Sequence, residues 1–397
     1  MIGSEMPKGW DIQPLKEVVT STKGKKPKQL SELPFDNSIP YIDIKALEKD
    51  LIEQYADVES SKSFSPNDIA VVWDGARCGW VSKTKEGAIG STICALTPKN
   101  NIESNYLYYF LLEKYPIVNS KGRGVGIPHV DPTFFWDMEV PIPSPKEQKQ
   151  IAEKLDKLFG QIETIKEASN KIPELLKNFR QQVLTYAVMG KLIESTPEPR
   201  MLGELIDELK YGTSKKADYD IEGFPILRIP NINNGEIDSS DLKYVPLDDK
   251  EYNQLSLQEG DILVIRSNGS LSIVGQCAIV RKECENWVYA GYLIRIRCTH
   301  ELLPEYLNYI FQSYQVRKQI VEKSHSMSGV NNFSADKIKQ LEIAWYPVEV
   351  QKQIVDKLNS IFGKLNEIEK QYNTLCEKLD KLPRTLLCKA FKGELNR

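Results

Sequence analysis

The sequence predicts two tandem α/β globular domains joined by two long α-helices, which pair as an antiparallel coiled coil with an approximate two-fold axis. Three observations predict this fold. The chain repeats itself after about 200 residues, each copy contains short strand-like runs, and each copy closes with a heptad pattern of apolar residues. A chain of 397 residues is also too long for one compact core.

The repeat is clearest in two helical segments. Residues 147–193 align with 350–396 at a constant offset of 203 residues, without a gap and with sixteen identities. These segments open with "EQKQIAEKLDKLFG" and "VQKQIVDKLNSIFG". Upstream, "NYLYYFLL" (105–112) matches "EYLNYIFQ" (305–312). The duplicated unit is therefore a whole module of nearly half the chain.

The repeat divides the chain into four predicted regions. They are a globular region at 1–145, a helical region at 146–195, a second globular region at 196–347 and a second helical region at 348–397. Short β-like runs between Gly, Asn and Pro fill the globular regions. The clearest runs are Ile69–Trp73, Ile262–Ile265, Cys277–Val280 and Leu293–Ile296. "STPEPR" (195–200) is predicted to be a linker, because its two prolines cannot continue a helix.

Apolar residues in both helical regions follow one another at alternating steps of four and three. The predicted seam residues are Ile151, Leu155, Leu158, Ile162, Ile165, Ile172, Leu176, Phe179, Ile354, Leu358, Ile361, Leu365, Ile368, Tyr372, Leu375, Leu379 and Leu382. A heptad held over this length is typical of a coiled coil. The second helix must return toward the first globular region if the two seams meet, so we expect antiparallel pairing. Pro173 and Pro383 are expected to kink or interrupt the helices.

The composition is that of an ordinary folded protein, with 41% hydrophobic residues, 27% charged residues and a net charge of −3. No run approaches the roughly 18 apolar residues of a membrane span and no signal peptide opens the sequence, so we expect a cytoplasmic protein. The seven cysteines are scattered without a CxxC pair, which favours reduced thiols over a zinc site. The mild negative charge excludes a uniformly basic protein but leaves local basic faces open.

Motifs of catalysis are missing from the sequence. It has no GxxxxGK[ST] phosphate loop and no GxGxxG between a strand and a helix, and three widely spaced histidines do not support a catalytic triad. "KGRGVG" (121–126) comes nearest, but "IPHVDP" follows and cannot open a helix cleanly. A basic loop or an ordinary surface turn is the better interpretation. We therefore expect a non-catalytic chain with no metal site and no cofactor of its own.

Two lysine-rich loops occupy corresponding places in the two modules and are candidates for contacting DNA phosphates. They hold Lys23, Lys25, Lys26 and Lys28 in the first module and Lys210, Lys215 and Lys216 in the second. Each neutralised phosphate would add salt-dependent affinity. Loop lysines also serve solubility, so their occurrence in both modules is what favours binding.

Further candidates carry the hydrogen-bonding tips or flat faces that read base edges. The first module offers Trp73, Arg77, Lys121, Arg123 and His129, and the second offers Arg266, Asn268, Ser270, His325, Asn331 and Asn332. The alternative is structural, because tryptophans fill cores and asparagines build turns. Corresponding loops differ in chemistry while the scaffold repeats, which favours a reader of two different half-sites.

The order globe, helix, globe, helix resembles the specificity subunit of type I restriction–modification enzymes. The resemblance is carried by "KEQKQIAEKLDKLFG" and "EVQKQIVDKLNSIFG", which open the two helices, and it covers the full length. "MPKGWDIQPLKEV" and "GAIGSTICALTP" (87–98) also resemble that family's first target-recognition domain.

The resemblance implies that each globular region is a target-recognition domain for one half of a bipartite double-stranded DNA site. The helices would set the spacer and dock two methyltransferase subunits, and restriction subunits would join that core. S-adenosylmethionine, ATP and magnesium would be bound by these partners, which would carry adenine-N6 methylation and ATP-dependent cleavage.

Two other interpretations stay open at this point. One is a coiled-coil scaffold whose globular domains bind protein partners, and the other is an enzyme with an unrecognised active site. The basic loops found in both modules disfavour the scaffold, and the missing motifs disfavour the enzyme.

Overall fold

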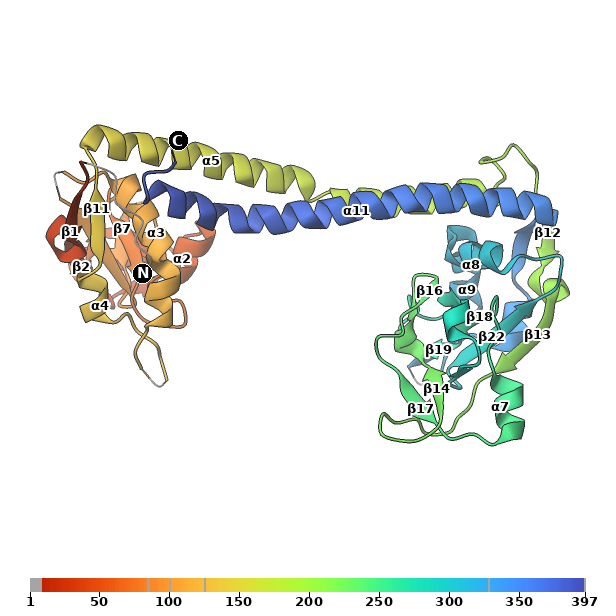
Figure 1. The fold of residues 1–397 in the computed structure, drawn as a ribbon. Helices are drawn as coiled ribbons and strands as arrows, with labels where there is room; N and C mark the ends of the chain where they lie inside the picture. Colours follow the sequence, from red (N-terminus) through yellow and green to blue (C-terminus); the bar gives the residue numbers. More distant parts are fainter. Residues whose placement is uncertain (1–8, 84–85, 100, 125, 328, 396–397) are drawn as a thin grey trace. The chain divides into compact units, whose positions relative to one another are not determined.

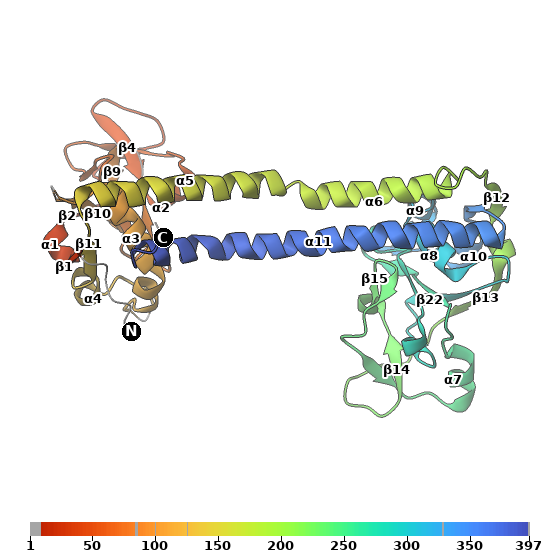
Figure 2. The same ribbon diagram turned by 45° about the horizontal axis from the view of Figure 1, so that its top comes forward.

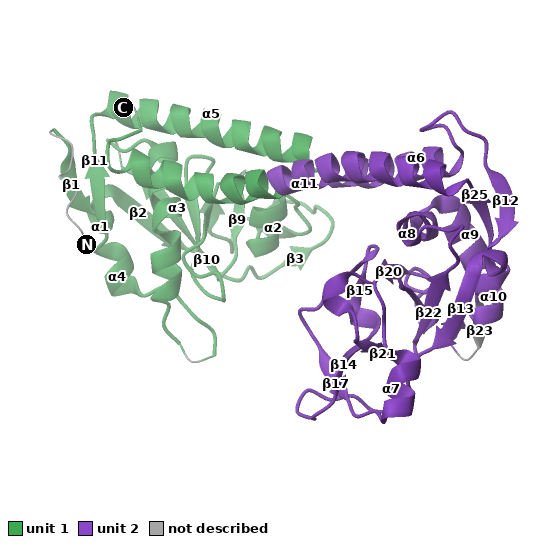
Figure 3. Cartoon of the chain, turned by 45° about the vertical axis from the view of Figure 1, so that its right-hand side comes forward, with its two compact units in different colours: residues 1–170, 373–397 green, residues 171–372 purple. Residues whose placement is uncertain are grey.

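The computed structural model describes residues 9–83, 86–99, 101–124, 126–327 and 329–395. The chain divides into two compact units (Figure 3): unit 1 holds residues 1–170 and 373–397, and unit 2 holds residues 171–372. Each unit combines one globular region with parts of both predicted helical regions.

In unit 1 a four-stranded antiparallel sheet runs in the order β2-β10-β7-β8. Its strands are β2 (Val19–Lys23), β10 (Ile93–Pro98), β7 (Ile69–Val72) and β8 (Val81–Ser82). Alternate residues of a strand point to opposite faces of the sheet. Ile69 and Val71 therefore pack with the helix α3 (Ser104–Ser120), whereas Ala70 and Val72 pack toward a second sheet. β7 is buried on both faces.

The second sheet of unit 1 has the order β3-β5-β4-β9-β6, with β4 and β9 parallel. Its strands are β3 (Leu30–Ser31), β5 (Tyr55–Asp57), β4 (Ser38–Ile42), β9 (Gly87–Ile89) and β6 (Ser63–Phe64). The short helices of this unit are α1 (Leu15–Val18), α2 (Ile44–Lys49) and α4 (Pro132–Trp136). Asp43 starts α2 by accepting the N–H of Ala46, and Asp131 starts α4 in the same way.

Unit 2 repeats this plan. Its main sheet has the order β13-β22-β18-β20, and its second sheet has the order β17-β14-β21 with β14 and β21 parallel. The strands are β13 (Ile206–Tyr211), β22 (Leu293–Cys298), β18 (Ile262–Ile265), β20 (Cys277–Ile279), β17 (Lys243–Val245), β14 (Phe224–Leu227) and β21 (Val288–Tyr289). The predicted strands in both modules are confirmed within one or two residues.

Smaller elements complete unit 2. They are β15 (Ile232–Asn233), β16 (Glu236–Ile237), α7 (Asp249–Leu255), β19 (Ser267–Asn268), α8 (Pro304–Gln312), α9 (Tyr314–Lys323), β23 (His325–Met327), β24 (Val330–Asn332) and α10 (Ala335–Lys339). Short 3-10 turns lie at Leu202–Leu205, Ile229–Asn231 and Lys282–Cys284. One apolar core joins the main sheet to α8, α9 and the long helices, and a second core lies between the two sheets.

In each unit the first strand of the globular region pairs with the strand that precedes a long helix. β1 (Asp11–Pro14) pairs antiparallel with β11 (Glu139–Ile142), and β12 (Glu198–Met201) pairs with β25 (Glu342–Trp345). The linker prediction for 195–200 is therefore wrong in its second half, which lies in β12. Prolines exclude a helix there, but each of these two-stranded sheets consists only of edge strands, where proline is tolerated.

Three long helices leave the globular regions (Figures 1 and 2): α5 (Pro145–Ser169), α6 (Ile172–Val188) and α11 (Val348–Ala390). Asn170 and Lys171 separate α5 from α6, and Pro173 lies in the first turn of α6. The interruption predicted near Pro173 is confirmed. The interruption predicted at Pro383 is wrong, because α11 continues through that residue. A proline removes one helix hydrogen bond, and the turns on both sides of Pro383 keep the helical conformation.

The helices pair antiparallel within each unit. In unit 1, Lys154 Nζ donates to the carbonyl of Leu395 at 2.6 Å, and Lys166 forms an ion pair with Asp380 at 2.9 Å. Residue numbers rise along α5 while they fall along its partner, so the two segments run in opposite directions. The predicted antiparallel pairing is confirmed in unit 1.

The same pairing occurs in unit 2. Lys357 Nζ donates to the carbonyl of Leu192 at 2.7 Å, and Arg180 donates to Asn366 at 2.7 Å. Lys357 and Leu192 stand one repeat away from Lys154 and Leu395, so the two units use the same contact. It fixes the start of one helical segment against the end of the other.

The seam is buried only in part. The buried seam residues are Ile151, Leu155, Ile162, Ile354, Leu358, Leu365 and Leu379, and the half-buried ones are Leu158, Ile172, Leu176, Ile361 and Tyr372. The remaining five are exposed by more than a third, which corrects their assignment to a covered seam: Ile165 (44%), Phe179 (47%), Ile368 (46%), Leu375 (39%) and Leu382 (38%). Two helices alone cover only one side of each apolar stripe, and these five receive no further cover within their own unit.

Two of the long helices, α5 and α11, are also fixed to a globular region by a tyrosine. The Tyr109 hydroxyl donates to Asp156 on α5 at 2.6 Å, and the Tyr309 hydroxyl donates to Asn359 on α11 at 2.5 Å. Burial raises the pKa of Tyr109, and the carboxylate of Asp156 raises it further.

Among the described residues, no helix combines the length and the apolar character needed to cross a membrane.

Candidate nucleic-acid interface

In unit 1 two loops meet at the end of β7. The N–H of Gly75 donates to the carbonyl of Pro128 at 2.7 Å, and the N–H of Val130 donates to the carbonyl of Trp73 at 2.9 Å. Arg123 and His129 exchange backbone hydrogen bonds at 2.8 Å. The fold therefore brings together Trp73, Arg123 and His129, which lie far apart in the sequence.

The cations of this cluster have partners. Lys23, at the end of β2, forms an ion pair with Asp74 at 2.7 Å and lies 5.5 Å from the ring centre of Trp73. Arg123 pairs with Asp131 at 2.6 Å. Lys121 lies 4.1 Å from the ring centre of Phe134. These interactions hold the side chains in place and reduce the net positive charge that the cluster presents.

Trp73 itself is half-buried. Its ring packs edge-on against Phe135, with 5.4 Å between ring centres, and lies 5.7 Å from Trp136. The interpretation of Trp73 as a core residue therefore accounts for much of its surface. Arg77, four residues further along, forms an ion pair with Glu48 on α2.

Lys25, Lys26 and Lys28 are exposed on the loop between β2 and β3. No ion pair links them to a described carboxylate, in contrast to Lys23. The loop is anchored by its backbone, since the N–H of Lys28 donates to the Ser60 hydroxyl at 2.8 Å. Three cations on an anchored loop suit contacts with phosphates.

In unit 2 the candidates Asn268, His325, Asn331 and Asn332 form one small sheet of order β19-β24-β23. The buried amide of Asn331 donates to the carbonyl of Gly269 at 3.0 Å, so it is already used inside the protein. Asn268 accepts the N–H of Ser270. These two asparagines build the turn, as the structural alternative expected.

The other candidates of this sheet differ from one another. Asn332 is exposed and pairs through its backbone with His325, whose side chain lies outside the described part of the structure. The hydroxyls of Ser270 and Ser272 lie 2.7 Å apart. Asn332 in the sheet and Ser270 in the loop after β19 are both exposed, so their side chains present polar atoms at the surface.

The three candidate lysines of the second module do not share one loop, because Lys210 lies in a strand and Lys215 and Lys216 follow it. Lys210 lies in the strand β13 and not in a loop, which corrects the prediction for this residue, and its Nζ is 3.9 Å from Glu208. Lys215 forms an ion pair with Glu251 on α7. Lys216 is exposed, and no ion pair links it to a described residue. Lys216 therefore presents its full charge to the solvent.

Arg266 directly follows β18, and its guanidinium lies 4.8 Å from the ring centre of Tyr211. Its Nε is buried without a hydrogen-bond partner, and the side chain makes no ion pair within the described residues. Of the candidates in unit 2, Arg266 combines a fixed position with a charge that no described carboxylate neutralises.

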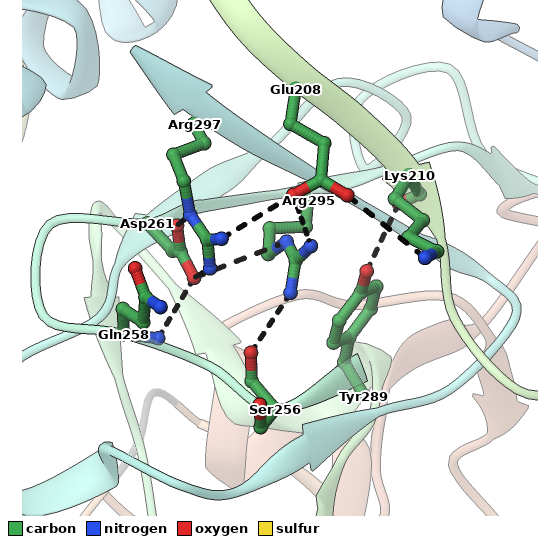
Figure 4. A network of polar contacts seen from close by, with 8 residues as sticks. All are labelled: Glu208, Lys210, Ser256, Gln258, Asp261, Tyr289, Arg295 and Arg297. Carbon is green, nitrogen blue, oxygen red and sulfur yellow. Dashed lines mark hydrogen bonds and ion pairs between the residues drawn. The ribbon is translucent and has the colours of Figure 1, made fainter. Parts of the chain in front are cut away.

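Sequence reasoning missed a partly buried polar network in unit 2 (Figure 4). Glu208 accepts from Arg295 at 2.6 Å and from Arg297 at 3.3 Å, and Arg297 also donates to both oxygens of Asp261 at 2.8 and 2.9 Å. Arg295 and Asp261 are only 2% and 1% exposed. The hydrogen bonds from Arg297 to Asp261 raise the pKa of the guanidinium.

The signal for this network was present in "LIRIRC" (293–298), where arginines alternate with apolar residues in a strand. Such alternation places both arginines on one face of β22. Glu208 lies on β13, both arginines lie on β22 and Asp261 directly precedes β18, so the ion pairs join three neighbouring strands of the main sheet. We assign it to the scaffold and not to the interface.

Unit 1 has a smaller version of this network. Asp68, at the position equivalent to Asp261, accepts the hydroxyl of Thr97 at 2.6 Å and the N–H of Ser65 at 2.7 Å. Threonine stands where unit 2 has Arg297.

The cysteines show no sign of a reactive or metal-binding site. All seven are free thiols. Burial raises the pKa of Cys94 to about 11 and that of Cys277 to about 12, which keeps both protonated at neutral pH. Among the described residues, no group of three or more His, Cys, Asp or Glu side chains is placed to hold a metal ion.

Comparison with known proteins places these features in a family. The family described as "Type I restriction modification DNA specificity domain" matches residues 7–174 and 195–378, one match for each module. The EcoKI specificity subunit of Escherichia coli (strain K12) is 32% identical over 100% of this chain and 91% of its own length. The StySPI specificity subunit of Salmonella potsdam is 29% identical over 98% of this chain and 90% of its own length.

Solved structures agree with the fold. The HsdS subunit from Thermoanaerobacter tengcongensis matches with a TM-score of 0.66 and 18% identity, over 99% of both chains. A chain from a study of complex assembly in a type I R-M system matches with a TM-score of 0.69 and 16% identity, over 99% of this chain and 100% of that one. The chain belongs to the DNA specificity subunits of type I restriction–modification systems, and it serves such a system as a DNA-recognition subunit without catalytic activity of its own.

Proposed function

We propose that each globular region reads one half of a bipartite site in double-stranded DNA, and that the paired helices set the non-specific spacer between the halves. The observation that carries this proposal is one repeated scaffold with two different loop surfaces. His129 and Asn332 occupy equivalent places. His129 precedes Val130, whose N–H donates to the carbonyl of Trp73, and Asn332 precedes Phe333, whose N–H donates to the carbonyl of Arg266. The scaffold is common to both units, whereas the side chains available to DNA differ.

We also propose that the helices dock two methyltransferase subunits. Two identical partners need two equivalent surfaces. Ile165 and Ile368 stand one repeat apart and are 44% and 46% exposed, and Phe179 and Leu382 are likewise equivalent and exposed. Exposed apolar residues at matching positions are what an interface with a repeated partner requires.

The register of each helix pair supports this docking surface. The Lys166–Asp380 ion pair brings Ile165 and Leu382 to one level of the pair in unit 1. The bond from Arg180 to Asn366 does the same for Phe179 and Ile368 in unit 2. We call each of these couples an exposed apolar pair.

In this proposal the chemistry belongs to the partners. S-adenosylmethionine would be bound by the methyltransferase subunits, and ATP and magnesium by restriction subunits that join the complex. The target is genomic DNA, so we place the protein's function in the cytoplasm.

The proposal is tested by co-expressing this subunit with its cognate methyltransferase subunits and mapping methylated adenines across the genome. We expect methylation at one bipartite sequence, and none without this subunit. A stable complex that leaves every adenine unmethylated would instead favour the protein-binding scaffold.

Two engineered variants separate the roles of the regions. Replacing residues 1–145 with the first globular region of another family member should change one half-site and leave the other intact. Adding one heptad to both helical regions should lengthen the spacer and leave both half-sites intact. A changed half-site after the heptad insertion would contradict the spacer role.

A further inference from the structure

Trp73 and Arg266 occupy the same place in the two repeats. The N–H of Trp73 donates to the carbonyl of Thr92 at 2.7 Å, and its carbonyl accepts the N–H of Val130 at 2.9 Å. Both bonds recur one repeat later. The backbone around this position is therefore the same in both units.

In unit 2, the N–H of Arg266 donates to the carbonyl of Tyr292 at 2.9 Å. Its carbonyl accepts the N–H of Phe333 at 2.7 Å. The two side chains therefore start from equivalent backbone positions, but the side chain is an indole in unit 1 and a guanidinium in unit 2.

The residue beside this position has also been exchanged. Lys23 lies opposite Cys94 in the main sheet of unit 1, and Tyr211 lies opposite Ile294 in the main sheet of unit 2, so Lys23 and Tyr211 are equivalent. Unit 1 places a lysine from β2 over an indole, and unit 2 places an arginine over a ring from β13. The cation and the ring have changed places.

The two cations differ in what neutralises them. Lys23 forms an ion pair with Asp74, the residue that follows Trp73. The residue that follows Arg266 is Ser267, which has no charge. Within the described residues no carboxylate pairs with Arg266 and no hydrogen bond engages its side chain. Among the described residues, the charge and the terminal donors of Arg266 are therefore left without a partner.

We propose that Arg266 is a specificity-determining residue, which reads a guanine in the half-site recognised by the second globular region. This inference rests on the proposed function. A guanidinium donates two parallel hydrogen bonds to O6 and N7 of guanine, which no other base accepts in the same way. The cation–π contact with Tyr211 holds the guanidinium over the ring, so little side-chain freedom is lost on binding.

The buried Nε supports the same geometry. It is shielded without a hydrogen-bond partner, so the atoms left to meet a base are the two terminal nitrogens at the tip. In unit 1 the equivalent side chain is the indole of Trp73, which packs on Phe135, and the neighbouring cation, Lys23, forms an ion pair with Asp74. An arginine therefore reads the second half-site at this position, and none reads the first.

The test uses the full chain assembled with its cognate methyltransferase subunits. The probe is a pool of duplex DNA randomised across the second half-site, with the first half-site fixed to the sequence found in the methylation map. Bound duplexes are sequenced for the wild type, Arg266→Ala and Arg266→Lys. We expect the wild type to require guanine at one position, and Arg266→Ala to reduce the preference at that position alone by about ten- to a hundred-fold.

Two further variants sharpen the comparison. Tyr211→Leu removes the stacking ring and should relax the same position by a smaller factor. Lys23→Ala removes the equivalent cation of unit 1 and should leave every preference in the second half-site unchanged. Arg266→Lys keeps the charge but replaces the planar fork with a flexible point charge, so it should assemble normally and show a weaker guanine preference than the wild type.

The outcomes are distinct. Weaker binding to all sequences, with the guanine preference intact, would mean that Arg266 contacts a phosphate and would overturn the proposal while leaving the proposed function in place. Unchanged preference in both Arg266 variants would overturn it as well. A wild-type complex that selects no sequence in the second half-site would overturn the proposed function itself.

Discussion

The Oε1 atom of Gln351 accepts the backbone N–H of Leu303 at 2.8 Å, which ties the first turn of α11 to the start of α8. The Nε2 atom of the same amide donates to the carbonyls of Glu301 and Tyr346 at 2.8 and 2.7 Å. Gln351 is fully buried. The amide therefore satisfies three backbone groups at the point where the globular region meets the long helix.

Gln148 makes the same three contacts in unit 1. It accepts the N–H of Glu103 at 2.9 Å and donates to the carbonyls of Asn101 and Pro143 at 3.1 and 3.0 Å. The repeated "QKQI" thus marks a joint and not only a helix start. Its glutamine is repeated because both units need the same joint.

We expect Gln351→Leu to lower the free energy of unfolding of unit 2 by about 3 kcal/mol, because leucine leaves the N–H of Leu303 and the carbonyl of Tyr346 without this partner. Among the described residues, the carbonyl of Glu301 keeps only the Trp345 indole as a donor. Gln351→Glu should cost at least as much, since a carboxylate oxygen would face two carbonyls. Urea denaturation followed by circular dichroism measures both. Gln353→Ala, at an exposed position of the same helix, is the matched control and should change stability by less than about 0.5 kcal/mol. Equal losses in the control and in Gln351→Leu would contradict the joint.

Asp261 and Asp68 offer a comparison between the two units. Asp261→Asn should destabilise unit 2 by about 3 kcal/mol, because the buried Arg295 and the half-buried Arg297 lose their most buried counter-charge. Asp68→Asn should cost only about 1 kcal/mol, since the Thr97 hydroxyl can reverse its hydrogen bond to an amide. Thermal denaturation of the two variants checks the difference. A loss for Asp261→Asn no larger than about 1 kcal/mol would contradict the dependence of the two arginines on this carboxylate.

The sequence predicts the two helical regions and the four most apolar strands, β7, β18, β20 and β22, because their periodic patterns depend on local burial. The seam positions nearest the globular regions, such as Ile151 and Ile354, are buried as expected. Positions such as Phe179 are exposed because a heptad pattern tells which face is apolar but not what covers it. Shorter edge strands such as β12 were missed, since the partner of β12, β25, lies more than a hundred residues away.

The candidate site was predicted in outline only. Loops after buried strands and basic loops in both modules were identified, and the fold brings Trp73, Arg123 and His129 together. Charge neutralisation could not be predicted, because Asp74 and Asp131 act through geometry that only the fold supplies. The exchange of cation and ring between the units could likewise be recognised only from the register of the two sheets, which aligns Lys23 with Tyr211.

The two prolines of the helical regions allow a direct test of helix strain. Pro383 lies inside α11, where proline leaves one carbonyl without its helical donor. Pro383→Ala should therefore raise the free energy of unfolding by up to about 3 kcal/mol. Pro173 lies in the first turn of α6, where an N–H has no helical partner anyway, so Pro173→Ala should change it by less than about 1 kcal/mol. Denaturant midpoints decide the matter, and a larger gain at Pro173 would contradict this account.

The exposed apolar pairs predict how the partner subunits bind. Ile165→Glu places a charge where a methyltransferase subunit would bury an apolar side chain, so its affinity for one of the two docking surfaces should fall at least about tenfold. Because Ile165 is 44% exposed, the stability of the chain alone should change by less than about 1 kcal/mol. Ile368→Glu should do the same at the other surface, and the double variant should bind neither subunit.

Native mass spectrometry of the assembled complex counts the bound methyltransferase subunits in each variant. We expect two for the wild type, one for each single variant at limiting concentration, and none for the double variant. The matched control is Thr164→Glu, which adds the same charge one residue away at an exposed position where the second repeat already carries Glu367. If the control loses a subunit as readily as Ile165→Glu, charge alone disrupts docking. If instead the double variant still binds two subunits, the partners dock elsewhere on the chain, and the helices serve only to separate the two readers.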